Sequence, residues 1–568
     1  LALAAAAALV LLPLSSGDWV VGHNEGMRYL ALAEHFREAL LETQGYPRWL
    51  PRLYGGYGYP TFVFYQPLIF FLDAAWSVLF HGTRALWAAL FSLLFAGSSA
   101  VFLLARRYGG VIWSLAVAGI FLLSPYLYVD LYVRHALAEL ASLLLAPWLL
   151  FSVLQLHDRI RAREPKASAI ALVAVSQAAL VYAHPLTSFL LDCSLLPVWL
   201  ATCLRGRRLA LADIWPLALG IGLGVLLSAL YWLPTVLMSG EVNMDGASQG
   251  YSQATRHTVH WFQFFSREWG FGGSAEDSPD DGMPFQLGAA HFALAVVAFG
   301  LARKTPLVIS AFVAYLAVIL AMTPWCAWLW RLPGFERTQF PWRMLVVTTV
   351  LQSFLLAAAG GQFSRLRHTW QRLAAAGGLL LGVALWQEPQ FQLAGRIEHA
   401  DQVVRAEFDT ARNHVQRYNG ADEFRPKTTP RGDPRPLGDS PLLSADHGRL
   451  TFAPESTAFA VVAELETNRT TWLSLHQLYL PGWLVTLDGR PIRDEKLRGW
   501  LDRRGAMRIR VPVESGVPQR IRIEARYAGP RGQRAAEALA LLALVAWCGF
   551  AWFERRQPRP GPVAAAAG

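Results

Sequence analysis

The chain has 568 residues, of which 54% are hydrophobic and 16% are charged. Soluble domains carry about 25% charged residues, so this composition argues against a soluble globular protein. The formal net charge of +10 leaves two classes open. A basic chain can bind nucleic acid or another acidic partner, or it can be a membrane protein whose cytoplasmic loops hold an excess of Lys and Arg.

The apolar residues gather in runs of roughly 15 to 25, the length at which a helix crosses about 30 Å of hydrocarbon. Many of the 22 tryptophans lie at the ends of these runs, where aromatic side chains anchor a protein in the membrane interface. The pattern predicts a mainly α-helical, polytopic membrane protein with about twelve transmembrane helices. We interpret the first run as a helix rather than as the core of a signal peptide. The candidate spans are 1–14, 84–105, 110–125, 136–156, 168–183, 186–204, 211–238, 289–302, 305–322, 344–361, 373–387 and 535–553.

The apolar run 66–82 contains Asp73 and is interpreted as a re-entrant or interfacial helix. Counting it as a span would put Arg106, Arg107 and the basic loop 157–167 outside, against the positive-inside rule. Without it, one side of the membrane carries 17 basic and four acidic residues. The net charge therefore follows from topology, which argues against a nucleic-acid role. We expect a multi-pass protein of the bacterial cytoplasmic (inner) membrane with a cytoplasmic C-terminus.

Four long segments then lie outside the cytoplasm, at 15–83, 239–288, 323–343 and 388–534. The expected organisation follows directly from them. It consists of a polytopic transmembrane module at 1–387 with a large first outer loop at 15–83, an extracytoplasmic domain at 388–534, the last transmembrane helix at 535–553 and a cytoplasmic tail at 554–568. The extracytoplasmic domain divides into an irregular or helical part, 388–440, and a β-sandwich, 441–530.

The strands of this domain are predicted from residues 449–527, which are rich in β-branched and aromatic side chains. The segments 508–511 and 520–523 alternate strictly between charged and apolar residues, as half-buried strands do. Asp488-Gly489 is a tight hairpin signal. Several short strands with regular turns indicate a small β-sandwich. We favour a structural or carbohydrate-binding role for this domain over a catalytic role.

The first outer loop holds the residues that most directly suggest chemistry. Asp18 and the run His23-Asn24-Glu25 precede an amphipathic helix, and a Gly/Tyr-rich tract follows it. The candidate tyrosines are Tyr57 and Tyr59 in that tract and Tyr65 in the segment after it. Their rings could stack on a sugar or an isoprenoid, or they could be anchors of a packed interfacial loop.

A second group, Asp130, Arg134, His135 and Glu139, lies at the outer end between two spans. In a helix, Asp130/Arg134 and His135/Glu139 would be i,i+4 pairs. Ionisable residues at membrane depth are costly and often functional, although an ion pair that holds two helix ends is the alternative.

Two further outer-face residues are candidates. Arg343 precedes a span, where it could bind a lipid phosphate or snorkel to the interface. His184 joins two spans at the outer face, where it could bind substrate or form a simple turn.

Metal and disulfide chemistry have little support in the sequence. The four cysteines form no paired framework, and no Cys/His spacing fits a structural zinc site. His257 and His260 are spaced like a pair of metal ligands but have no obvious third ligand. The sequence predicts no definite cofactor, and a requirement for a divalent cation stays open.

The motifs of the chain resemble those of a known family. Its layout is similar to the GT-C superfamily of membrane glycosyltransferases, and more narrowly to a bacterial membrane family labelled 6-pyruvoyl-tetrahydropterin-synthase-related. The pterin label implies no pterin chemistry, because the chain shows no convincing histidine triad. The matching residues are Pro47-Arg48-Trp49, Tyr57-Gly58-Tyr59-Pro60, Tyr65-Gln66-Pro67-Leu68, Ser124-Pro125-Tyr126, Arg134 with Glu139, Gln339-Phe340-Pro341-Trp342-Arg343, Ala421-Asp422-Glu423-Phe424-Arg425-Pro426 and Tyr479-Leu480-Pro481-Gly482-Trp483 with Asp488-Gly489.

The resemblance implies a sugar donor linked to polyprenyl phosphate and a cell-envelope glycan or protein as acceptor, at the outer membrane face. It also implies a carboxylate base soon after the first helix. Asn24 stands where related chains are expected to carry Asp, and an amide cannot act as a base. The role therefore falls to Glu25 or Asp18, with Arg134, His135 or Arg343 neutralising the leaving phosphate.

Two other functions stay open. The first is a non-catalytic scaffold or carbohydrate-binding membrane protein of the same fold, which Asn24 would suit. The second is a transporter, which is disfavoured because the sequence shows no internal repeat and no interrupted spans in matching halves.

Overall fold

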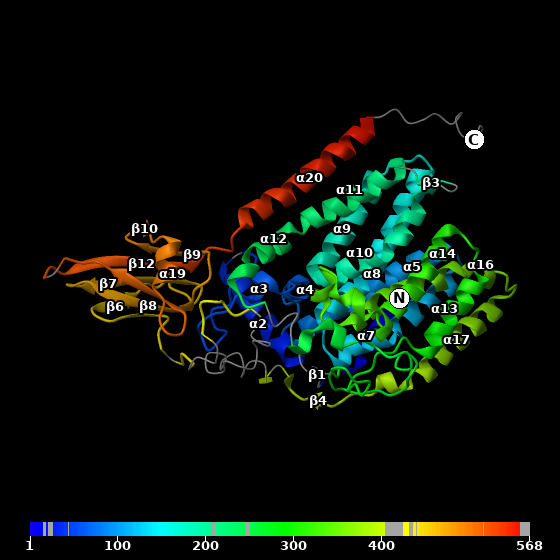
Figure 1. Ribbon diagram of the computed structural model, residues 1–568, viewed down its shortest axis with the longest axis horizontal. Coiled ribbons are helices and arrows are strands. Elements are labelled where there is room, and N and C mark those ends of the chain that lie inside the picture. The colour runs from blue at the N-terminus through cyan, green and yellow to red at the C-terminus, as the bar shows by residue number, and fades with distance from the viewer. Residues whose placement is uncertain are drawn as a thin grey trace.

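A computed structural model gives the architecture. It describes residues 1–14, 19–20, 26–43, 45–205, 208–209, 211–244, 250–400, 402–403, 424–430, 436–438, 440–514 and 516–556. A helical bundle forms the larger part of the molecule, and the strands between residues 443 and 527 lie together at one end of its long axis (Figure 1). The prediction of a mainly helical chain with a C-terminal β region is confirmed.

Among the described residues, five helices are long and apolar enough to cross a membrane, or up to eight if each bent pair counts as one span. The predicted count of about twelve spans is therefore not confirmed. Two shorter apolar helices, α9 (Ala167–Ala183) and α13 (Ala289–Leu301), account for part of the difference. The five long helical segments are Thr83–Arg106 (α5), Leu137–Arg161 (α8), Pro185–Thr202 (α10), Pro341–Phe363 (containing α15, Leu345–Ala358) and Gln533–Arg556 (α20).

Three further apolar segments are pairs of helices bent at a break, where the backbone ladder is interrupted. The bent pairs are α6 (Val111–Leu122) with Pro125–Val133 at 48°, α11 (Leu211–Leu227) with α12 (Ala229–Met238) at 65°, and α14 (Pro306–Ala321) with η7 (Pro324–Arg331) at 91°. Pro125 and Pro324 each begin the second helix of their pair. Proline suits a first helical turn but cannot donate to the preceding one.

The first outer loop forms short helices. It contains α2 (Gly26–Thr43), α3 (Thr61–Phe64) and α4 (Leu68–Trp76). The nine residues of α4 are too few to cross the hydrocarbon layer at 1.5 Å per residue. The run that contains Asp73 is thus not a full span, as the charge pattern predicted.

The C-terminal region forms two antiparallel sheets. The strands are β5 (Leu443–Ala445), β6 (Arg449–Phe452), β7 (Ala460–Thr467), β8 (Thr471–Leu478), β9 (Trp483–Leu487), β10 (Arg490–Pro491), β11 (Ala506–Val511) and β12 (Gln519–Tyr527). One sheet has the order β10-β9-β12-β7-β6 and the other β11-β8-β5. Along β8 and β12 buried and more exposed residues alternate, so each strand turns one face toward a core.

The last helix connects the β region back to the bundle. Figure 1 shows α20 running from the sheets alongside α12 and α11. At its far end the Glu554 carboxylate accepts hydrogen bonds from the backbone N–H groups of Lys166 (2.8 Å) and Ala167 (2.7 Å). These donors open α9, whose first turn has no helical acceptors. A carboxylate from α20 therefore caps α9 and holds the end of the chain against it.

Candidate functional site

Two groups of residues that are distant in the sequence meet where the helical backbone is interrupted. The π-helical turn η2 (Val129–Val133) leads into the first turn of α8. The short turns η8 (Phe335–Thr338) and η9 (Pro341–Met344) precede α15. Their charged side chains, Asp130, Arg134, Glu139 and Arg343, together with Tyr126, form what we call the arginine–carboxylate cluster.

Arg134 holds the two carboxylates of this cluster together. Its Nη1 lies 2.5 Å from Asp130 Oδ1 and 3.1 Å from Glu139 Oε2, and its Nη2 lies 3.1 Å from that same Glu139 oxygen. Tyr126 Oη donates to the other Glu139 oxygen over 2.5 Å. Asp130 and Glu139 are 0% and 2% exposed, and buried charges require such partners. The i,i+4 pairing predicted for Asp130 and Arg134 is present.

Arg343 approaches Glu139 from the opposite element. Its Nε lies 3.4 Å from Glu139 Oε2, close enough for an ion pair, while its Nη1 donates to Thr338 O (3.1 Å) and Gln339 Oε1 (2.9 Å). The cluster thus contains two guanidinium groups and two carboxylates. The Arg134 guanidinium also lies over the Trp342 ring, 4.4 Å from its centroid, a favourable cation–π position.

The local backbone explains why these side chains converge. Arg134 N bonds to Val129 O, five residues earlier, at 2.8 Å, and such widened turns are frequent at functional sites. His135 follows with φ +53°, a left-handed conformation that costs a non-glycine residue about 1–3 kcal/mol. The chain then starts α8, where Glu139 lies in the first turn and the helix dipole favours its negative charge.

His135 is enclosed but unpaired. The residue is 0% exposed, and neither ring nitrogen has a hydrogen-bond partner among the residues that the structure describes. Its ring centroid lies 5.9 Å from that of Trp19, so the first outer loop reaches the cluster here. The short strand β1 (Trp19–Val20) pairs with β4 (Arg396–Ile397) at this point.

Several buried polar atoms around the cluster lack hydrogen-bond partners. Within the described part of the chain they include Asp130 Oδ2, both His135 nitrogens, Thr338 Oγ1, Trp342 Nε1 and Arg343 Nε. More than about 90% of buried polar groups in folded proteins are hydrogen-bonded. A concentration of unpaired donors and acceptors in one place therefore indicates a site for a polar ligand.

His184 and Tyr65 have defined contacts near this region. His184 Nδ1 accepts from Thr187 N at 3.2 Å, so it caps α10 at its N-terminus. Tyr65 Oη lies 2.6 Å from Tyr29 Oη. The Tyr29 hydroxyl in turn accepts from Ala138 N over 3.3 Å, which connects Tyr65 to the first turn of α8. A substrate-binding role for His184 and Tyr65 stays a prediction.

Tyr57 and Tyr59 lie in the interface between the first outer loop and the β region. Tyr57 O accepts from Leu478 N (2.7 Å), and Tyr57 Oη accepts from Arg504 Nη1 (2.7 Å). Tyr59 Oη accepts from Phe424 N over 3.1 Å. Burial raises the pKa of Tyr57, and the charge of Arg504 and its hydrogen bond partly offset this increase. These contacts anchor the loop, and a substrate-binding role for the two tyrosines stays a prediction.

Arg48 has a structural role that the sequence did not indicate. Its Nη2 donates to Leu230 O over 2.5 Å and its Nη1 to Phe62 O over 3.3 Å, and its guanidinium lies 3.5 Å from the Tyr46 ring centroid. Leu230 O lacks its usual helical donor because Pro234, four residues on, has no N–H. A proline inside an apolar run, which needs an outside donor, is the signal that could have suggested Arg48.

Residues of α12 in the same region also donate hydrogen bonds to the last carbonyl groups of α3. Val63 O accepts from Thr235 Oγ1 at 2.7 Å, and Phe64 O accepts from Tyr231 Oη at 2.8 Å. The last carbonyls of a helix have no partners of their own. Side chains of α12 and Arg48 thus fix the position of α3, which directly precedes Tyr65.

Four of the predicted site residues, Asp18, His23, Asn24 and Glu25, lie outside the described residues. Among the residues described, no group of three or more His, Cys, Asp or Glu side chains could hold a metal ion. His257 of the weak pair predicted from the sequence binds Ser274 Oγ at 2.8 Å and also contacts Tyr251 O.

The sequence matches no protein-family model and no curated protein. Solved structures that are similar to it include two transferases. One is the arabinofuranosyltransferase AftD from Mycobacteria, with 19% identity and a TM-score of 0.41 over 68% of this chain and 27% of that one. The other is the Archaeoglobus fulgidus oligosaccharyltransferase in the apo form, with 12% identity and a TM-score of 0.39 over 69% of this chain and 56% of that one. The similarity thus spans about a quarter of the first structure's length and just over half of the second's.

Proposed function

We propose that this protein is a membrane glycosyltransferase that moves a sugar from a polyprenyl-phosphate donor to an acceptor at the outer face of the bacterial cytoplasmic membrane. The observation that carries the proposal is the group of unpaired buried polar atoms around Arg134, Glu139 and Arg343. This group lies at the interrupted ends of apolar helices, next to the first outer loop. A donor with an apolar tail and an anionic head suits such a position.

The donors of the site match a phosphate ester. Arg343 Nε, Trp342 Nε1 and Thr338 Oγ1 are buried and have no hydrogen-bond partner among the described residues. Hydrogen bonds from a guanidinium to phosphate are short and strong. Arg343 also has the looser carboxylate contact of the two arginines, at 3.4 Å, so its charge is the one available to a ligand.

The remaining unpaired atoms suit sugar hydroxyl groups. Asp130 Oδ2 is an acceptor, and each His135 nitrogen donates or accepts according to its tautomer. Arg134, held between two carboxylates, positions these groups more than it binds the phosphate. The site therefore offers donors to an anion on one side and acceptors to hydroxyl groups on the other.

The reaction needs a base and a stabilised leaving group. The Glu25 or Asp18 carboxylate takes the proton of the acceptor hydroxyl. The acceptor oxygen attacks the anomeric carbon, the bond from that carbon to the phosphate oxygen breaks, and polyprenyl phosphate leaves with the bonding electron pair. Fixed cationic donors at the leaving oxygen lower the barrier without reorganisation, a role we give to Arg343.

The resemblance of the sequence motifs to those of membrane glycosyltransferases supports this proposal, and Asn24 limits the choice of base. The β region is proposed to position the acceptor, a cell-envelope glycan or protein. Its contact with the first outer loop through Tyr57 and Leu478 would couple acceptor binding to that loop.

Sugar transfer from a panel of radiolabelled polyprenyl-phosphate sugars tests the proposal, with purified protein in native lipid extract. We expect transfer with at least one donor and its loss in Glu25→Gln or in Asp18→Asn, with the folded state of each variant checked by gel filtration. No transfer with any donor from folded protein would overturn the proposal and favour a non-catalytic carbohydrate-binding membrane protein.

A further inference from the structure

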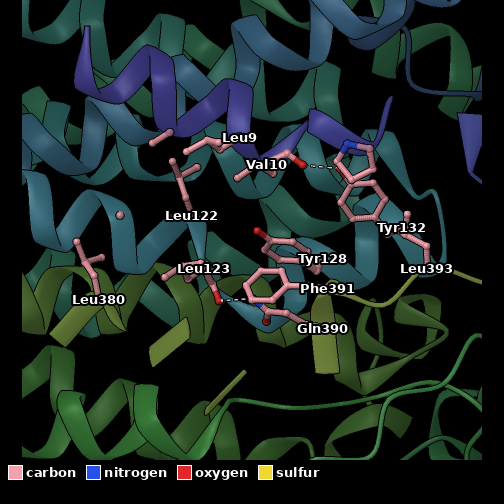
Figure 2. A pocket seen from close by; sticks show the side chains of 13 residues that line it. Leu9, Val10, Leu122, Leu123, Tyr128, Tyr132, Leu380, Gln390, Phe391 and Leu393 are labelled. Carbon is pink, nitrogen blue, oxygen red and sulfur yellow. Dashed lines mark hydrogen bonds between the residues drawn. The ribbon is translucent and has the colours of Figure 1, made fainter. Parts of the chain in front are cut away.

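A largely apolar cavity of 360 Å³ lies beside the π-helical turn η2, on the face opposite Asp130 of the arginine–carboxylate cluster. Figure 2 shows its lining, which comes from α1 (Ala2–Val10), the end of α6, the turn η2, α17 (Thr369–Trp386) and the segment after α17. Ligand-binding pockets in proteins usually measure about 300–1,000 Å³. The cavity is thus large enough for part of a small molecule or for a hydrocarbon chain.

The cavity opens to the exterior of the bundle. Leu9 and Phe391 both line it and are 68% and 44% exposed. Leu12, on the turn after α1, is also exposed. Exposed leucine and phenylalanine on an apolar helix face hydrocarbon rather than water in a membrane protein. The opening is therefore accessible to lipid chains.

One hydroxyl group in the lining of the cavity has no protein partner among the described residues. Figure 2 shows Tyr132 bonded to the backbone of Val10 and Gln390 bonded to the backbone of Leu123, whereas no bond reaches the Tyr128 hydroxyl. Tyr128 is 5% exposed and has no hydrogen-bond partner among the described residues. This hydroxyl can therefore donate a hydrogen bond to an acceptor on a ligand in the cavity.

The geometry separates this cavity from the arginine–carboxylate cluster. Tyr128 directly precedes η2 and Tyr132 lies within it, each two residues from Asp130, which places both on the face of the helical turn opposite Asp130. A molecule whose phosphate is held at Arg343 would need to pass through this backbone to reach the cavity. The occupant is thus a separate molecule from a sugar donor bound in the cluster.

We propose that the cavity binds one acyl chain of a membrane glycerophospholipid, with an ester carbonyl of the lipid accepting a hydrogen bond from Tyr128. The chain packs between α1, α6 and α17 and supports η2 from behind, opposite Asp130. This site does not depend on sugar transfer and would exist in a protein without that activity.

Photocrosslinking tests the proposal. Full-length protein is reconstituted in bilayers that contain a phosphatidylcholine with a diazirine in one acyl chain, and labelled peptides are identified by mass spectrometry. We expect labelling of peptides 111–133 and 387–400 well above that of the exposed face of α13. Leu9→Trp, which fills the opening, should abolish the excess, whereas Val297→Trp, a change at an exposed α13 residue outside the lining, should leave it intact.

Tyr128→Phe provides a second variant that keeps the shape of the cavity. It should lower the labelling about fivefold, the factor that a hydrogen bond worth roughly 1 kcal/mol supplies. Labelling spread evenly over the outward-facing helices would overturn the proposal. Displacement of the label by polyprenyl phosphate, under conditions in which unlabelled phosphatidylcholine does not displace it, would also overturn it and identify the cavity as an isoprenoid site.

Discussion

Trp49 Nε1 donates a hydrogen bond of 2.7 Å to Gln477 Oε1, joining two residues that are 428 positions apart. The amide nitrogen of Gln477 donates in turn to Pro51 O (3.3 Å) and Gly56 O (2.9 Å). The Trp49 ring packs edge-on against Trp483 with centroids 5.5 Å apart. One buried glutamine thus binds three groups of the first outer loop and fixes the β region against the membrane module.

This interface depends on a glycine. Gly58 has φ +79°, and a Cβ atom there would lie 2.4 Å from both Gln477 Oε1 and Trp49 Nε1. We predict that Gly58→Ala lowers the melting temperature measured by thermal unfolding in detergent, because it combines backbone strain with a clash in the interface. Gly489→Ala is the matched control, since Gly489 has φ +75° and open space around it. It should show only the backbone strain, about 1–2 kcal/mol. Equal losses in the two variants would contradict the interface role of Gly58.

Arg48 is predicted to stabilise the fold rather than the reaction. Arg48→Met leaves Leu230 O and Phe62 O unpaired, which costs about 1–3 kcal/mol for each buried carbonyl. The expected result is a clear loss of thermal stability. Arg52→Met removes a partly exposed ion pair with Glu38 and should cost about 0–1 kcal/mol. If the Arg48→Met protein were as stable as the Arg52→Met protein, this role would be ruled out.

Asp73 gives the protein a pH-dependent stability. Burial raises the pKa of Asp73 to about 6. The nearby Arg37 guanidinium, 3.6 Å away, lowers this pKa, but its effect is smaller than that of burial. Because the folded-state pKa lies above the ordinary value of 3.8, the stabilisation is full below pH 3.8 and is lost as the pH rises through 6. A shift of about two pKa units corresponds to about 3 kcal/mol.

The measurement is the melting temperature between pH 4 and pH 7, compared between wild type and Asp73→Asn. The difference between the two proteins should change in favour of the Asn variant as the pH rises. Asp158→Asn, a change in an exposed carboxyl that pairs with Arg107, should track wild type. Parallel curves for Asp73→Asn and wild type would show that Asp73 does not titrate in this range.

We expect His135 to lower the stability of the fold and to raise the rate of sugar transfer. Its left-handed backbone and unpaired imidazole are unfavourable for folding, and such strain persists where function requires it. Asn adopts this backbone conformation more readily than His. We therefore predict that His135→Asn keeps or raises the melting temperature while transfer slows. A large loss of stability with an unchanged transfer rate would show that His135 is a structural residue.

Local signals in the sequence predicted part of this structure well. Asp488-Gly489 forms the expected hairpin, with φ of +48° and +75° at the two residues, as a two-residue turn with both φ values positive requires. The pairing of Asp130 with Arg134 follows from spacing alone. Both features depend on residues within a few positions of each other.

Contacts between distant segments could not be predicted in this way. No local pattern indicates that Gln477 reaches the Gly/Tyr tract, which was interpreted as a possible sugar-stacking surface. The sequence left Arg343 as either a ligand of a lipid phosphate or a snorkelling interface residue, and its approach to Glu139 depends on how α15 packs against α8. The predicted count of about twelve spans is not confirmed, because helix breaks and short helices resemble continuous apolar runs in the sequence.

The most direct test of the proposed phosphate site is the initial rate of sugar transfer by Arg343→Gln, measured with a polyprenyl-phosphate donor that the wild type uses. Removal of one preorganised donor at a developing negative charge typically lowers the rate by about 10²–10³-fold, and we predict a loss of this size. Arg337→Gln, a change at an exposed arginine six residues earlier, should retain the wild-type rate. Equal rates for Arg343→Gln and wild type, with both proteins folded, would contradict the assignment of this cluster as the phosphate site of a glycosyltransferase.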